Sequence, residues 1–148
     1  MRRALLAAGH EDSIAEFPEG TRNCADAAAA VGCSVAQIAK SIVFRAGEDV
    51  VLVVASGAHR IDRAKVAAAV GSPVKTADAA WVHSRTGFAV GGVAPVAHDC
   101  PVTILIDSEL LSLDPLWAAA GSPHHVFRTS AGALLRLTGG TVAEVRQE

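Results

Sequence analysis

Lys40 is the charged residue whose position in the chain most suggests chemistry. It lies between a short apolar segment, Val35–Ala39, and the apolar run Ile42–Phe44, so its side chain starts beside the core. A lysine at such a junction can aim its ammonium into a cleft, where a fixed cation can hold a phosphate or the carbonyl of an ester. The alternative, which the residue type alone favours, is a lysine whose stem follows apolar surface and whose charge reaches water.

A glycine-rich loop is the second candidate. The segment Gly87–Pro95 contains the adjacent glycines Gly91 and Gly92, a pattern incompatible with ordinary helix. Because glycine has no Cβ, its backbone amide can approach a ligand closely. Consecutive N–H groups can also surround an oxygen on which negative charge develops. The alternative is a tight turn between two elements.

A second loop, Gly121–His125, presents His124 and His125. A histidine there can move a proton or donate a hydrogen bond near neutral pH, although a surface turn is the simpler interpretation. The other histidines are scattered, and their spacing does not indicate a metal site. The chain has no phosphate-binding loop, dinucleotide fingerprint or Gly-x-Ser-x-Gly elbow, so we expect no metal and no cofactor.

Composition favours one domain over residues 1–148. Half of the residues are apolar and 19% are charged, which excludes a disordered chain. The net charge of -2 argues against a protein that follows duplex nucleic acid and leaves open an enzyme acting on one end of a tRNA. Cys24, Cys33 and Cys100 lack paired spacing and are expected to be reduced. The N-terminal apolar run is too short for a signal peptide, so we expect a soluble, cytoplasmic protein.

Helical and extended patterns alternate along the chain. Asn23, Asp62 and Thr76 are expected to cap helices. Several expected strands are joined by short turns, which favours a mixed α/β or α+β domain over a regular doubly wound fold. The expected helices are Ala25–Val31, Val35–Ala39, Arg63–Val70, Ala77–Arg85 and Ala131–Leu137, and the expected strands are Ser41–Arg45, Val50–Ala55, Val102–Ile106, Trp117–Ala120, Val126–Phe127 and Val142–Val145.

The order of these segments resembles the YbaK/EbsC family of aminoacyl-tRNA deacylases, which is related to the editing domain of prolyl-tRNA synthetase. The likeness runs from about Ile14 to Val145. It implies a mixed, mostly antiparallel sheet flanked by helices. The segments that carry it are Glu16–Arg22, Gln37–Phe44, Ser56–Gly57, Ile61–Val66, Thr86–Pro95, Ala120–Gly121 and Leu137–Gly140.

The resemblance implies a set of site residues. Lys40 matches the active-site lysine of the family. The resemblance also implies catalytic roles for Gly92 and for His124, a histidine that some members use. Many relatives carry serine where this chain has Ala94. Cysteine-specific relatives have an aspartate after the glycine that matches Gly121; here it is absent, and the apolar Val126 lies near that position. The residues expected to bind the aminoacyl group and terminal adenosine are Ser41, Phe88, Gly91, Val93, Ala94, Pro95 and Gly121.

The implied function is trans-editing: hydrolysis of mischarged aminoacyl-tRNA, with proline tRNA carrying alanine or cysteine as the expected substrate. Lys40 would orient the terminal nucleotide or the carbonyl, and loop amides would stabilise the oxyanion. The implied partners are the 3′ acceptor end of the tRNA and an aminoacyl-tRNA synthetase, without any membrane. One alternative is a non-catalytic module that binds the charged 3′ end, and a weaker one is a small-molecule esterase.

Overall fold

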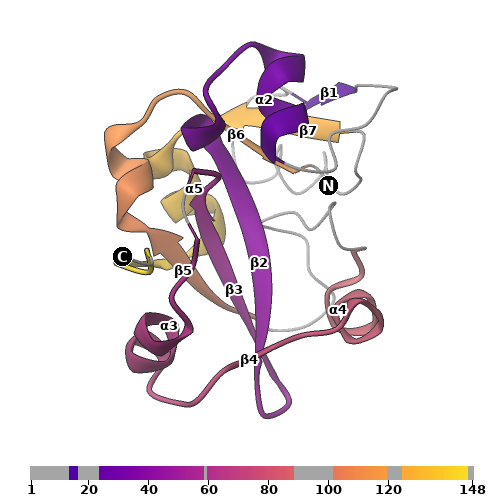
Figure 1. The fold of residues 1–148 in the computed structure, drawn as a ribbon, viewed down its shortest axis with the longest axis vertical. Helices are drawn as coiled ribbons and strands as arrows, with labels where there is room; N and C mark the ends of the chain where they lie inside the picture. Colours follow the sequence, from indigo (N-terminus) through magenta and orange to yellow (C-terminus); the bar gives the residue numbers. More distant parts are fainter. Residues whose placement is uncertain (1–13, 17–23, 59, 89–101, 120–124, 147–148) are drawn as a thin grey trace.

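The computed structural model describes residues 14–16, 24–58, 60–88, 102–119 and 125–146 (Figure 1). None of the helices in these ranges is long and apolar enough to cross a membrane. The elements are β1 (Ile14–Glu16), α2 (Cys24–Val31), η1 (Val35–Gln37), β2 (Ile38–Ala46), β3 (Asp49–Ser56), α3 (Arg63–Val70), β4 (Lys75–Thr76), α4 (Ala79–Thr86), β5 (Val102–Asp107), η2 (Ser108–Ser112), β6 (Leu116–Ala119), β7 (His125–Thr129), α5 (Ala131–Thr138) and β8 (Thr141–Ala143).

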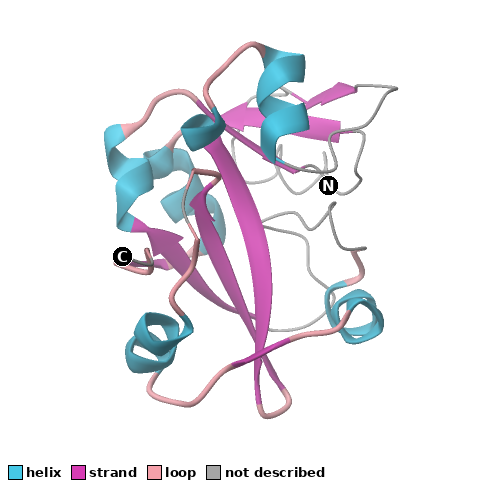
Figure 2. Ribbon diagram, viewed as in Figure 1, coloured by secondary structure: helices cyan, strands magenta, loops and turns pink. Residues whose placement is uncertain are grey.

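The strands form one mixed sheet in the order β1-β7-β6-β2-β3-β5-β8, with β4 paired to β2. The antiparallel pairs are β1/β7, β6/β7, β2/β3 and β2/β4. The parallel pairs are β2/β6, β3/β5 and β5/β8. The prediction of a mixed α/β architecture with a sheet flanked by helices is therefore confirmed (Figure 2).

A long β-hairpin of β2 and β3 forms the centre of the molecule (Figure 1). Its register runs from Ala39 opposite Ser56 to Ala46 opposite Asp49. Gly47 turns the chain between the strands with a φ of 62°, in the left-handed region that glycine adopts without a steric penalty. The apolar run Val50–Ala55 is buried throughout, as expected for a strand covered on both faces.

Two apolar layers cover the faces of this hairpin. Side chains alternate along each strand, so one face of β3 carries Leu52 and Val54 and the other carries Val51 and Val53. The first face packs with Val82 of α4, Leu110 of η2 and Ala131 and Leu134 of α5. The second face packs with Val66 of α3 and with Val74 and Val145. A smaller cluster joins Ala27 and Ala28 of α2 to Ile38 of β2.

Side-chain caps fix the starts of three helices. Asp62 caps α3 as expected, since its carboxylate accepts from the backbone N–H groups of Ala64 and Lys65. Ser130 caps α5 in the same way through the N–H of Ala133. The expectation that Thr76 caps α4 is wrong, because Thr76 belongs to β4 and Asp78 accepts from the N–H of Trp81 at 2.8 Å.

Element boundaries differ from expectation where distant partners decide them. The helix expected over Val35–Ala39 is a 3-10 turn that ends at Gln37, because Ile38 and Ala39 pair with Trp117 and Ala118 of β6. At the C-terminal end, β8 stops at Ala143. The remainder of the expected strand Val142–Val145 leaves the sheet, and the Val145 carbonyl accepts from the N–H of Asp62.

Candidate functional site

Lys40 is the third residue of β2, in the central hairpin. It lies opposite Ala55 of β3, and its side chain is half-buried. By strand alternation it shares a face with Ile38, Ile42 and Phe44. Phe44 and Ala55 belong to the apolar layer that packs on α3, and Ile38 contacts α2. The Lys40 side chain therefore starts on the face of the central strand that carries these apolar contacts, and its role as a fixed cation stays a prediction.

Ser41 faces the other side of β2. It lies opposite Val54, on the face where Ala39 and Val43 pack against α4 and α5. Its Oγ is buried and has no hydrogen-bond partner in the described part of the chain. Phe88 packs against that same apolar layer. The structure thus brings Ser41 and Phe88 to one face and directs the Lys40 side chain to the opposite face.

The edge of β2 away from β3 carries two short pairings. β6 pairs with Ile38 and Ala39 at one end, and β4 pairs with Phe44 and Arg45 at the other. Between them, residues 40–43 have no strand partner on this edge among the described strands. Lys40 lies at the β6 end of this interval.

Asp107, which the sequence reading did not single out, holds the end of β3 beside Lys40. It is fully buried at the end of β5. One carboxylate oxygen accepts from the N–H of Ser56 at 3.1 Å, and the other accepts from the N–H of Glu109 at 3.0 Å. Backbone donors of this kind satisfy a buried carboxylate. The residue thereby ties together the ends of β3 and β5 and the start of η2.

Ser56 extends this connection to the segment that leads into Lys40. Its hydroxyl donates to the carbonyl of Ala36 at 2.8 Å, and the next N–H, of Gly57, donates to the carbonyl of Ile38 at 2.7 Å. Lys40 follows Ile38 by two residues. The chain Asp107–Ser56–Ala36 therefore fixes the backbone on both strands next to Lys40.

The start of the glycine-rich loop is anchored by Thr86 at the end of α4. Its buried hydroxyl donates to the carbonyl of Val82 at 2.8 Å and accepts from the N–H of Phe88 at 3.1 Å. Gly87 ends the helix with a φ of 81°, and its N–H donates to the carbonyl of His83. The Thr-Gly-Phe segment thus sets the direction in which the chain enters the loop.

The loop residues Gly91–Pro95, together with Gly121 and His124, lie outside the described residues, so their expected roles stay predictions. His125, the last residue of the segment Gly121–His125, is described: it begins β7 and lies opposite Glu16 of β1.

Cys33 is not poised as a nucleophile. Burial raises the pKa of its thiol, and Sγ donates to the carbonyl of Ser34 at 3.3 Å. A backbone hydrogen bond lowers this pKa by less than burial raises it, so the thiol form is favoured, whereas the thiolate is the reactive form.

Comparisons with known proteins identify the family. A family model described as the aminoacyl-tRNA editing domain matches residues 18–137. The chain therefore belongs to the aminoacyl-tRNA editing domain family, and the resemblance inferred from the motifs is confirmed. It is 34% identical over 115 residues to the uncharacterized protein YwhH of Bacillus subtilis, covering 76% of this chain and 72% of YwhH.

Solved structures share the whole fold. A candidate trans-editing enzyme for prolyl-tRNA synthetase superposes with a TM-score of 0.93 at 39% identity, covering 99% of this chain and 94% of that chain. The hypothetical protein APE2540 superposes with a TM-score of 0.91 at 30% identity, covering 98% and 97% of the two chains. These matches extend the family assignment from the sequence to the arrangement of the sheet and helices.

Proposed function

We propose that this protein is an aminoacyl-tRNA deacylase that releases wrongly attached amino acids. The observation that carries the proposal is the editing-domain match over residues 18–137, which includes Lys40 on the central hairpin. The scissile bond is an activated ester, so a positioned cation and oxyanion donors suffice without a protein nucleophile. The raised pKa of the Cys33 thiol agrees with such a mechanism.

In the proposed reaction, Lys40 orients the terminal nucleotide or the ester carbonyl. Water, or a group of the substrate itself, attacks the carbonyl carbon, and the bond to the ribose oxygen breaks. Backbone N–H groups of Gly91 and Gly92 donate hydrogen bonds to the oxyanion. His124 transfers the proton to the departing ribose oxygen. The remaining binding positions would be Ser41, acting through its main chain, and Phe88, Val93, Ala94, Pro95 and Gly121.

The proposed substrate is proline tRNA carrying a small non-cognate residue such as alanine or cysteine. The support is the likeness to a candidate trans-editing enzyme for prolyl-tRNA synthetase. The apolar Val126, buried in β7, lies near the position where cysteine-specific relatives have aspartate. Alanine is therefore the first substrate to test. A synthetase partner would supply tRNA selection that a chain of net charge -2 does not provide alone.

A binding module without catalysis is the second candidate, because Ala94 replaces the serine of many relatives and removes a hydroxyl from the pocket loop. The test is to incubate the purified protein with mischarged tRNAs, foremost proline tRNA carrying alanine or cysteine, and to follow release of free amino acid. We expect turnover of at least one of them. Protection of the ester with tight binding would favour the binding module instead.

A further inference from the structure

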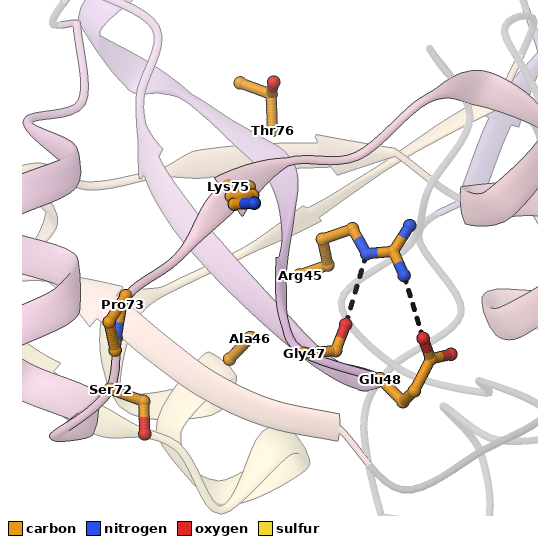
Figure 3. A pocket seen from close by; sticks show the side chains of 8 residues that line it. All are labelled: Arg45, Ala46, Gly47, Glu48, Ser72, Pro73, Lys75 and Thr76. Carbon is orange, nitrogen blue, oxygen red and sulfur yellow. Dashed lines mark hydrogen bonds and ion pairs between the residues drawn. The ribbon is translucent and has the colours of Figure 1, made fainter.

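A pocket lies at the far end of the central hairpin from Lys40. It has a volume of about 670 Å³ and is lined by the β2–β3 turn and by the segment leading into β4 (Figure 3). Its charged lining residues are Arg45, Glu48 and Lys75, and Ser72 and Thr76 add hydroxyl groups. The cationic side chains and hydroxyl groups in this lining are of the kind that bind a phosphate group.

The guanidinium of Arg45 is held in a fixed orientation. Nε donates to the carbonyl of Gly47 at 3.2 Å, and Nη2 donates to the Glu48 carboxylate at 3.0 Å (Figure 3). The same guanidinium stacks on Trp81, with 4.7 Å between its central carbon and the ring centroid. A guanidinium held in this way loses little freedom when a phosphate oxygen binds to its remaining N–H groups.

Two further cations belong to this cluster. Arg85 stacks on the Trp81 ring at 5.4 Å and pairs with the second carboxylate oxygen of Glu48. Lys75 lies opposite Arg45 in the β2/β4 pair and is exposed, with no ion-pair partner in the described part of the chain. Among the residues that line the pocket, Glu48 is the one carboxylate, and Arg45 and Arg85 share it, so the Lys75 ammonium remains for an anionic ligand.

The distance to Lys40 fits a nucleic-acid strand. Lys40 and Arg45 are five residues apart on β2, or about 17 Å at roughly 3.3 Å per residue. A stacked RNA strand covers that distance in about five nucleotides at ~3.4 Å each. A 3′ end bound at Lys40 would therefore bring the first base pairs of the acceptor stem to the pocket.

We infer that the Arg45–Lys75 pocket binds backbone phosphates of the tRNA acceptor stem while the 3′ end occupies the Lys40 site. The inference rests on the proposed function for its ligand. It also provides a tRNA contact on a chain whose net charge of -2 gives no general attraction to nucleic acid.

The test measures binding of uncharged proline tRNA at several salt concentrations for the wild type, Lys75→Gln and Arg136→Gln. Arg136, an exposed residue of α5, is the matched control. For Lys75→Gln we expect several-fold weaker binding near 0.1 M salt and a salt-dependence slope reduced by about one unit, as for one lost phosphate contact. Arg136→Gln should match the wild type.

A second variant should change binding in the opposite direction. Glu48→Gln removes the negative charge but keeps an acceptor for a guanidinium, so tRNA binding should tighten. Wild-type affinity and slope in both Lys75→Gln and Glu48→Gln, or no salt-dependent binding by the wild type, would overturn the inference. Because this tRNA carries no amino acid, the binding test does not depend on deacylation. Unchanged binding by the two variants would contradict the pocket, whereas absence of deacylation would contradict the proposed enzyme.

Discussion

At the scale of single residues, Asp107 holds the strand ends beside Lys40, a role that local sequence patterns do not show. It stands at the end of an apolar strand, yet its carboxylate is buried and accepts from two backbone N–H groups. The Asp-Ser-Glu order at residues 107–109 is typical of a helix start and could have revealed it. The connection to Ser56 depends on contact between β3 and β5, which sequence patterns do not report.

Asp107→Ala should leave the N–H groups of Ser56 and Glu109 without an acceptor. We expect it to lower the free energy of unfolding by about 2–4 kcal/mol, and Asp107→Asn to lower it by less because the amide keeps one acceptor oxygen. Urea unfolding of the three proteins measures both effects. Equal stability of Asp107→Ala and the wild type would refute the supporting role.

Ser41 gives a residue-scale test of where the substrate lies. Its Oγ has no hydrogen-bond partner in the described part of the chain and faces away from the Lys40 side chain. Ser41→Ala should therefore leave the free energy of unfolding unchanged or raise it by up to about 1 kcal/mol. The KM for charged tRNA should also stay at the wild-type value. A large rise in KM would show that the hydroxyl contacts substrate.

At the scale of elements, sequence patterns predicted the helices and strands whose bounds depend on neighbouring residues in the chain. The cap of α3, the β2–β3 hairpin and the helix Ala131–Thr138 follow from capping residues, β-branched runs and apolar spacing. The start of β2 does not, because Ile38 and Ala39 are drawn into the sheet by β6, about 80 residues further along the chain. The two-residue strand β4 exists only through its pairing with β2.

The cap of α3 provides the element-scale prediction. Asp62→Ala removes the acceptor for the N–H groups of Ala64 and Lys65 and should lower the free energy of unfolding by about 0.5–2 kcal/mol. Asp62→Ser, which keeps a capping oxygen, should recover most of this loss. Thermal unfolding of both variants measures it. A cap that contributes nothing would leave the Asp62→Ala midpoint at the wild-type value.

At the scale of the whole molecule, the central hairpin separates the two proposed contacts with tRNA. Lys40 is near one end of β2, and the Arg45–Lys75 pocket is at the other. The motifs identified the family from one sequence, and the role of Lys40 that the family resemblance implies stays a prediction. Strand alternation alone places Lys40 and Ser41 on opposite faces, but which apolar layer each face contacts depends on the packing of distant helices. The pocket could not be foreseen, since its residues come from segments whose pairing is not local.

The most direct test of the account is release of alanine from alanyl-tRNA(Pro) under single-turnover conditions by the wild type and Lys40→Ala. The account predicts turnover by the wild type and a loss on the order of 10²–10³-fold in the variant, comparable to removal of an oxyanion donor. Matching thermal unfolding curves would show that the fold is retained. Near-equal rates in the two proteins would contradict the central role assigned to Lys40.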